Sequence, residues 1–219
     1  MSLLDFARGP AITLALAVFC LGVLWRLVSL VGLPWAKDRS RRRAGAPGDF
    51  GNAVSAFIRH LWVPKEIGLT SRFTFINGYV FHLGLAVVVF GFAQHILFLR
   101  GLFGLSWPGL PTGVITVVGV VTLASLIAAL VRRMTSPVLK LLSGVNDYVS
   151  WLVTFLPVLT GLLAVSHLGA RYESLLALHI LSVCLLLIWF PFGKLMHAFL
   201  VFLTRAETGI SYGRRGVKI

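Results

Sequence analysis

Long hydrophobic runs, separated by short polar stretches, dominate the chain. Five of them consist mainly of Leu, Val, Ala, Phe and Gly, and each is long enough to cross a bilayer core of about 30 Å as a helix. They cover approximately residues 11–32, 75–98, 111–132, 149–168 and 174–203. The alternation typical of barrel strands is absent from them. The pattern therefore predicts an all-α integral membrane bundle of five transmembrane helices, each of which satisfies its own backbone groups.

The composition agrees with a membrane protein and argues against a nucleic-acid partner. Of the 219 residues, 58% are hydrophobic, and twenty Lys and Arg against seven Asp and Glu give a net charge of +13. Proteins that bind nucleic acid are also basic, but here the basic residues cluster beside the hydrophobic runs, as membrane topology requires. We therefore expect one membrane domain, residues 1–219, and no nucleic-acid partner. Cys20 and Cys184 lie inside hydrophobic runs and are expected to be packing residues.

The distribution of basic residues predicts the orientation of the bundle. Lys and Arg are concentrated in the loop 33–74, in the loop after the third span and at the C-terminal end. On the other side of the bundle we count only Arg8, Arg100 and Arg171. By the positive-inside rule, the three basic segments face the cytoplasm. We therefore expect the N-terminus outside the cell and the C-terminus in the cytoplasm.

The cytoplasmic loop 33–74 contains a second kind of pattern. Within residues 49–62, apolar side chains recur at helical spacing: Phe50, Val54, Phe57, Ile58 and Leu61. This spacing predicts an amphipathic helix that lies on the cytoplasmic face of the membrane. Such a helix serves either to anchor the loop to the lipid or to dock a partner protein, and the pattern fits both roles.

Four histidines lie inside the second and fifth spans, where ionisable side chains are costly and usually functional. The two spans run in opposite directions, so the histidines match in depth: His82 with His197 near the cytoplasmic side, and His95 with His179 near the outer side. Two imidazoles at one depth, from two helices, are suitable axial ligands for a b-type haem. The sequence therefore predicts two haems, one above the other. A proton relay and a simple packing role are the alternatives.

The helical spacing of these residues supports one ligand pair better than the other. His179 and His197 are eighteen residues apart, or about five turns, which places them on one face of a continuous helix. His82 and His95 are thirteen residues apart, which separates them by about 140° around an ideal helix. A kink or bulge near Gly91, or the crossing of the helices, would absorb part of this angle; otherwise one ligand is misassigned, and His167 is the natural substitute for His95. Gly84 and Gly91 are expected to let a flat macrocycle approach the helix.

The arrangement resembles the gamma subunit of respiratory nitrate reductase, a five-span di-haem cytochrome b. The resemblance covers about residues 75–205 and is carried by FHLG at 81–84, by the gap from His179 to His197 and by FGKLMH at 192–197. In that subunit the second histidine of span two directly follows a glycine, at a shorter spacing. Here Gly91 is followed by Phe92 and the histidine comes at 95. This difference favours a divergent relative with a different catalytic partner.

The resemblance implies a membrane subunit of a respiratory oxidoreductase complex, in the inner (cytoplasmic) membrane of a bacterium or archaeon. Such a subunit transfers electrons between membrane quinone or quinol and an iron–sulfur subunit, which joins further catalytic subunits on the cytoplasmic side. The quinone site of the family lies beside the outer haem, where Gln94, His95, Arg100 and Trp107 are candidates here. Arg100 suits a quinone carbonyl or a haem propionate. The rival functions are a haem-free proton-coupled transporter and a haem-free membrane anchor.

Overall fold

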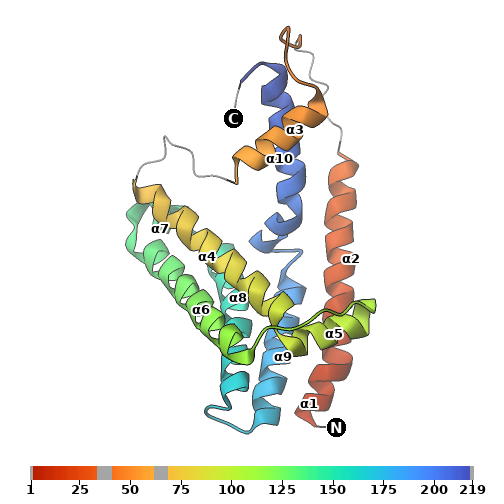
Figure 1. Cartoon of the computed structure of the whole chain (residues 1–219), viewed down its shortest axis with the longest axis vertical. Coiled ribbons are helices and arrows are strands. Elements are labelled where there is room, and N and C mark those ends of the chain that lie inside the picture. The colour runs from red at the N-terminus through yellow and green to blue at the C-terminus, as the bar shows by residue number, and fades with distance from the viewer. Residues whose placement is uncertain (1, 34–40, 62–68, 218–219) are drawn as a thin grey trace.

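Helices form all the secondary structure of the computed structural model, which describes residues 2–33, 41–61 and 69–217. In chain order they are α1 (Leu3–Phe6), the π-helical turn η1 (Ala7–Ala11), α2 (Ile12–Val31), α3 (Asp49–Arg59), α4 (Leu69–Gly91), α5 (Ala93–Phe103), α6 (Thr112–Thr135), α7 (Pro137–Leu142), α8 (Val145–Ser166), α9 (Tyr172–Trp189), the 3-10 turn η2 (Lys194–Met196) and α10 (His197–Arg214). Figure 1 shows the N-terminus and the C-terminus at opposite ends of the molecule.

Within the described residues, five helices are long and apolar enough to cross a membrane, which confirms the prediction of an all-α, multi-pass architecture. They comprise Leu3–Val31, Arg72–Gly91, Thr112–Thr135, Val145–Ser166 and Tyr172–Trp189. The first begins earlier than the expected residue 11. The Ser2 hydroxyl accepts a hydrogen bond from the Asp5 N–H, and the Asp5 carboxylate accepts one from the Ser2 N–H. This capping box starts the helix, and a π-helical turn accommodates Pro10.

The second predicted span, 75–98, is two helices and not one. Phe92 adopts an extended backbone (φ −78°, ψ 125°) between α4 and α5. The break leaves carbonyl groups free at the end of α4, and the loop before α6 returns to satisfy them. The Trp107 indole N–H donates to the Phe90 carbonyl (2.6 Å), and the Leu110 N–H donates to the Gly91 carbonyl (2.8 Å). The kink expected near Gly91 is therefore present, as a complete interruption of the helix.

The fifth predicted span, 174–203, is also interrupted. Helix α9 ends at Trp189, and a turn with a buried Pro191 leads through η2 to α10. Proline lacks the N–H that a continuing helix needs. The turn packs tightly on α2, because a Cβ atom added at Gly22 would lie 2.6 Å from Pro191 Cγ. The expectation of one continuous helix with His179 and His197 on a single face is therefore wrong.

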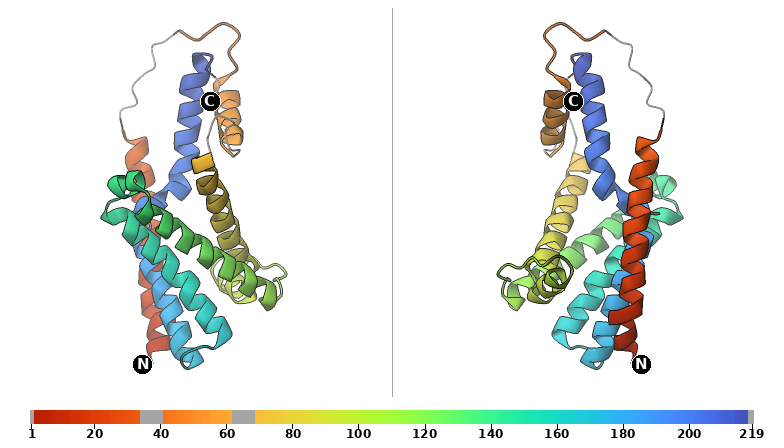
Figure 2. Two further views of the ribbon diagram at one scale, coloured as in Figure 1. Left: turned by 90° about the vertical axis from the view of Figure 1, so that its left-hand side faces the viewer. Right: turned by 90° about the vertical axis from the view of Figure 1, so that its right-hand side faces the viewer.

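The membrane-length helices pack in sequence: α4 on α6, α6 on α8, α8 on α9, and α9 on α2. Glycines permit the closest of these approaches. A Cβ at Gly84 would lie 2.1 Å from Thr122 Oγ1 on α6, and one at Gly91 would lie 2.9 Å from the Leu110 side chain. Both glycines thus serve protein packing, which corrects the expectation that they make room for a cofactor. Neither α9 nor α10 packs extensively along α4, and Figure 2 shows α4 standing apart from α9.

Helices α3 and α10 form a pair that projects beyond the ends of α2 and α4 (Figures 1 and 2). Small residues make the contact: Asn52 and Ala56 are buried, and Cβ atoms added at Gly209 or Gly213 would collide with them. Helix α3 ends at Arg59, short of the expected residue 62, which lies outside the described residues. The predicted apolar face of α3 stays largely exposed at Phe50, Val54, Ile58 and Leu61, while Phe57 stacks on Phe202 of α10.

Ion pairs fasten this helix pair at one end. Asp49, the first residue of α3, accepts hydrogen bonds from the Arg214 guanidinium, with Nε 3.0 Å from Oδ1, and also pairs with Arg42. The Arg214 hydrogen bond and the positive charges of Arg214 and Arg42 lower the pKa of Asp49. Residues 34–40 and 62–68 of the predicted loop, with Lys37, Arg39 and Lys65, lie outside the described residues.

Candidate functional site: two facing histidine pairs

The histidines that were matched by depth face one another in the structure. The imidazole rings of His82 on α4 and His197 at the start of α10 have centroids 6.1 Å apart, with their planes at 85°. The rings of His95 on α5 and His179 on α9 have centroids 6.0 Å apart, with their planes at 21°. The break at Phe92 produces the second pair, because it turns His95 away from the direction that a continuous helix would give it. The structure therefore brings together all four histidines in the expected pairs.

The separation of the rings suits two ligands of one metal ion. With a metal–nitrogen distance of about 2 Å on each side, and a ring centre about 1 Å beyond each nitrogen, two axial imidazoles have centroids roughly 6 Å apart. Ordinary aromatic contacts span about 4.5–7 Å, so this distance alone does not define a metal site. The hydrogen bonds of the rings carry the argument further.

Each of the four rings binds a backbone carbonyl through Nδ1. The partners are the carbonyl oxygens of Gly78 for His82 (2.7 Å), Val88 for His95 (3.0 Å), Pro157 for His179 (3.1 Å) and Lys194 for His197 (2.7 Å). A carbonyl only accepts, so Nδ1 carries the proton and Nε2 keeps its lone pair. Metal-binding histidines show this arrangement, in which the second ring nitrogen donates to a fixed acceptor.

His60 and His167 provide internal comparisons. His60 makes the same kind of bond, from Nδ1 to the Ala56 carbonyl at 2.7 Å, but no ring contact with a second imidazole is found for it among the described residues. His167 ends α8 in a left-handed conformation (φ 54°) and stacks on Tyr172, with centroids 5.1 Å apart. The structure therefore places His95, and not His167, against His179. Only the four paired histidines combine the carbonyl bond with a facing imidazole.

Helix α8 contacts the pair His95–His179, named the outer pair after the predicted orientation, from the side of His179. The Thr160 hydroxyl oxygen lies 3.3 Å from His179 Nδ1, close to the Pro157 carbonyl that binds the same nitrogen. Thr160 is buried and also contacts the Ser182 hydroxyl at 3.0 Å. Gly161 leaves room for the ring, because a Cβ there would lie 3.1 Å from His179 Cε1. The position of His179 is thus fixed by a neighbouring helix as well as by its own.

The other end of α8 holds the turn that precedes His197. The Asp147 side chain is 7% exposed, and both of its oxygens accept from the Lys194 ammonium, at 2.7 and 2.6 Å. Arg133 of α6 donates to the same carboxylate at 2.9 Å. The Asn146 side-chain oxygen accepts from the Lys194 backbone N–H at 3.0 Å. Since the Lys194 carbonyl binds His197, these contacts position the histidine through one residue.

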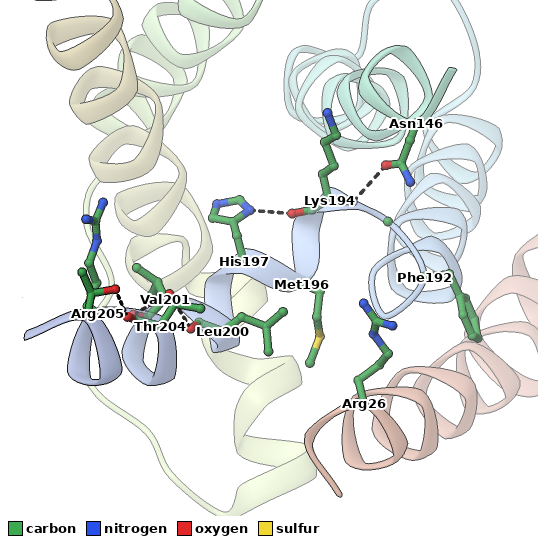
Figure 3. A pocket seen from close by; sticks show the side chains of 12 residues that line it. Arg26, Asn146, Phe192, Lys194, Met196, His197, Leu200, Val201, Thr204 and Arg205 are labelled. Atoms are coloured by element: carbon green, nitrogen blue, oxygen red, sulfur yellow. Dashed lines mark hydrogen bonds between the residues drawn. The ribbon is translucent and has the colours of Figure 1, made fainter. Parts of the chain in front are cut away.

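A cavity of about 860 Å³ lies beside His197, which with His82 forms the pair named the inner pair after the predicted orientation (Figure 3). Its walls include His197, Met196, Phe192, Leu200, Arg26 and Arg205. In Figure 3 the His197 ring and the Met196 side chain leave the turn on opposite sides, and Arg205 lies further along α10 on the side of His197. Among the described residues, neither Arg26 nor Arg205 forms an ion pair with a carboxylate. The cavity is therefore suited to an anionic group.

The residues expected at the quinone site lie on or next to α5. Gln94 and Arg100 are exposed on this helix, and Gln94 directly precedes His95. Trp107 is held by its bond to the Phe90 carbonyl, and its ring lies 6.5 Å from that of Phe90. The break at Phe92 thus begins a helix on which exposed Gln94 directly precedes His95 and exposed Arg100 follows it by five residues.

Each histidine pair offers two nitrogen ligands to a metal ion. Within the described ranges, no group of three or more His, Cys, Asp or Glu side chains is placed to hold a metal ion. Two axial nitrogens are the number that a haem iron takes from the protein when its other four ligands come from the macrocycle. Sequence reasoning missed Asp147, Asn146 and Thr160 as supports of the histidines. Their partners lie 19 to 48 residues away, and no local motif connects them.

The fold and the site define a multi-pass helical membrane protein with two pairs of facing imidazoles. The chain is 32% identical, over 217 residues, to a protein of Nitratidesulfovibrio vulgaris strain Hildenborough that bears only the name "Protein"; the match spans 96% of this chain and 94% of that relative. The chain belongs to the same family as this bacterial protein. No family model matches the chain. No solved structure matches it.

Proposed function

We propose that this protein is a di-haem cytochrome b, the membrane subunit of a respiratory oxidoreductase complex. It would transfer electrons between membrane quinone or quinol and a partner iron–sulfur subunit. The observation that supports this function is the pair of facing imidazoles at each of two depths, each imidazole with Nδ1 on a carbonyl and Nε2 free for iron. A b-type haem supplies one-electron redox chemistry when it is bound at such a pair.

The residues around each pair fit the proposed cofactor. His82 and His197 would hold the inner haem, and His95 and His179 the outer one. Helix α4 packs on α6 and not extensively on α9 or α10. A planar group could therefore lie between the facing rings without displacing a close contact between helices. Arg205 lies on the side of α10 that carries His197 and lines the adjacent cavity, where a guanidinium suits a haem propionate.

The proposed orientation places α3 and α10 in the cytoplasm and the N-terminus outside. The end of the molecule that carries α3 and α10 also carries the Arg-rich segments around residues 41–43 and 214–215. Positively charged segments remain preferentially on the cytoplasmic side. With this orientation the pair His95–His179 lies toward the outer face, and the proposed membrane is the inner (cytoplasmic) membrane of a bacterium or archaeon.

A quinone would bind beside the outer pair. Gln94 and Arg100 are exposed on α5, which is connected to the membrane-length helix α4 only through Phe92. An amide N–H or a guanidinium donates to a quinone carbonyl, and the exposed apolar residues Leu97 and Phe98 of the same helix suit its ring and tail. Electrons that enter here would pass to the inner haem and leave on the cytoplasmic side.

The proposed partner subunits, an iron–sulfur protein and the catalytic subunit it serves, would dock on the α3–α10 pair. This pair projects beyond the membrane-length helices, and its surface combines exposed apolar residues with arginines. Phe50 is 84% exposed and Ile58 is 52% exposed. A surface that combines exposed apolar residues with arginines suits a partner whose surface is acidic.

The direct test is the reduced-minus-oxidised absorption spectrum of the purified protein. We expect the α band of low-spin b-type haem and two haems per chain. His82→Ala and His197→Ala should each remove the same haem, and His95→Ala and His179→Ala the other. His60→Ala is the matched control, because His60 has the carbonyl bond without a facing ring. A wild-type protein with no α band would overturn the proposal in favour of a haem-free transporter or anchor.

A further inference from the structure

None of the four paired histidines lies on helix α8. This helix nevertheless contacts Lys194, which binds His197, and it contacts His179 directly. We infer that two positioning residues on this helix, Asp147 and Thr160, tune the two redox centres separately. Asp147 acts at the inner pair through Lys194, and Thr160 acts at the outer pair through His179. This inference rests on the proposed function, because it concerns the properties of haems held by these histidines.

At the inner pair, α8 fixes both the side chain and the backbone of one residue. Asp147 binds the Lys194 ammonium, and Asn146 binds the Lys194 N–H. The Lys194 carbonyl then accepts from His197 Nδ1 at 2.7 Å (Figure 3). The carboxylate is almost fully buried and compensates two cations, Lys194 and Arg133. Its removal would leave positive charge near the inner centre, and positive charge stabilises the reduced state of an iron that gains an electron.

At the outer pair, α8 acts on the imidazole directly. The Thr160 hydroxyl donates to the Leu156 carbonyl at 2.7 Å, so its oxygen is available to accept from His179 Nδ1. The Thr160 oxygen and the Pro157 carbonyl both accept from the Nδ1–H of His179. These hydrogen bonds increase the electron density on the ring and make Nε2 a stronger electron donor to iron. A stronger donor favours the oxidised state. The loss of this hydroxyl should therefore raise the potential of the outer centre.

The two effects are separated along the helix. Asp147 and Thr160 are thirteen residues apart, which corresponds to about 20 Å along α8. Coulomb interactions fall with distance, and the Thr160 contact is a short-range hydrogen bond to one ring. Each residue should therefore act mainly on one centre, and each variant is a control for the other.

The test is potentiometric titration of the purified wild-type protein and of Asp147→Asn and Thr160→Val. The two haems are first assigned from the spectra of His197→Ala and His179→Ala. We expect Asp147→Asn to raise mainly the midpoint potential of the inner haem, and Thr160→Val mainly that of the outer haem. Thr154→Val is the matched control: Thr154 is buried on the same helix and donates to the Ser150 carbonyl, and no bond from it to a histidine is found among the described residues.

Conservative variants keep the inference testable if the Asp147→Asn protein does not fold and cannot be purified. Asp147→Glu retains the charge and should restore the inner potential toward the wild-type value. Asn146→Ala removes the bond to the Lys194 backbone N–H, together with the bond from the Ser150 hydroxyl, and should change the low-spin electron paramagnetic resonance signal of the inner haem. Equal shifts at both haems, or none at either, would overturn the inference while the haem proposal stands. A wild-type protein without haem would instead overturn the proposed function.

Discussion

Lys194 is bound by Asp147 through both carboxylate oxygens, although the two residues lie on different elements and 47 positions apart. The Asp147 side chain is 7% exposed, whereas that of Lys194 is 57% exposed, so the buried charge depends on a partner that reaches it from the surface. Arg133 adds a second cation from α6. This carboxylate therefore connects α6, α8 and the turn before α10.

Loss of the Asp147 charge should destabilise the folded protein. Asp147→Asn leaves Lys194 and Arg133 without their shared counter-charge, and we expect a loss of about 2–3 kcal/mol, less than for a fully buried pair because Lys194 is partly solvated. The measurement is the thermal unfolding midpoint in detergent. Lys194→Met should cost less, because Arg133 still pairs with Asp147. An Asp147→Asn midpoint equal to that of the wild type would contradict this view of the site.

The outer ligand should be His95 and not His167. His95→Ala should lose the outer haem, since its ring faces His179 with centroids 6.0 Å apart. His167→Ala should retain both haems, since His167 stacks on Tyr172 at the end of α8. The pyridine haemochrome assay gives the haem content of each variant per chain. Retention of two haems in His95→Ala, with loss of one in His167→Ala, would reverse the assignment.

The approach of α4 to α6 should depend on the absence of a side chain at Gly84. A Cβ in Gly84→Ala would lie 2.1 Å from Thr122 Oγ1, so either the helices separate or Thr122 changes rotamer and loses its bond to the Val118 carbonyl, at a cost of about 1–3 kcal/mol. Gly78→Ala on the same helix is the control, because nothing lies within 4 Å of its Cβ position. Combining Gly84→Ala with Thr122→Ala should recover part of the loss. Unfolding midpoints that are the same for Gly84→Ala and Gly78→Ala would contradict the packing described.

Arg100 should affect quinol oxidation without affecting haem content. Arg100→Leu removes a charged donor from α5, and the rate of haem reduction by a soluble quinol analogue should fall roughly tenfold or more. Arg171→Leu is the matched control, since Arg171 is also exposed but lies before α9. Stopped-flow absorption at the α band measures the rate of haem reduction in each variant. Equal rates for the two variants would remove Arg100 from the proposed quinone site.

The α3–α10 pair should loosen in acid. The neighbouring arginines lower the pKa of Asp49, so its contribution to the folded state is present above the ordinary value of 3.8 and is lost as the pH falls through the lowered pKa. Spin labels on Val54→Cys and Glu207→Cys, in a background without the native cysteines, report the distance between the helices. We expect an unchanged distance from pH 7 to pH 5 and a broader distribution in strong acid. Asp49→Asn should show the broad distribution at pH 7.

Hydrophobicity and depth were enough to predict five spans and the facing of His82 with His197 and of His95 with His179. The helix end at Trp189 was not predicted, and at Gly91 only a kink or bulge was considered, because hydrophobicity continues through both breaks. Pro191 and Gly193 are a local signal for the first. The second depends on Trp107 and Leu110, whose bonds to the end of α4 arise only when the chain folds back. The supports of the histidines on α8 are likewise tertiary contacts.

The pairing of α3 with α10 has a consequence for biosynthesis. The ion pair between Asp49 and Arg214 joins positions 165 residues apart, and four membrane-length helices lie between the two elements. Because synthesis proceeds from the N-terminus, α3 must wait until all four have been inserted before its partner emerges. A protein that recognises both helices together would therefore bind only chains in which the four intervening helices have already been synthesised.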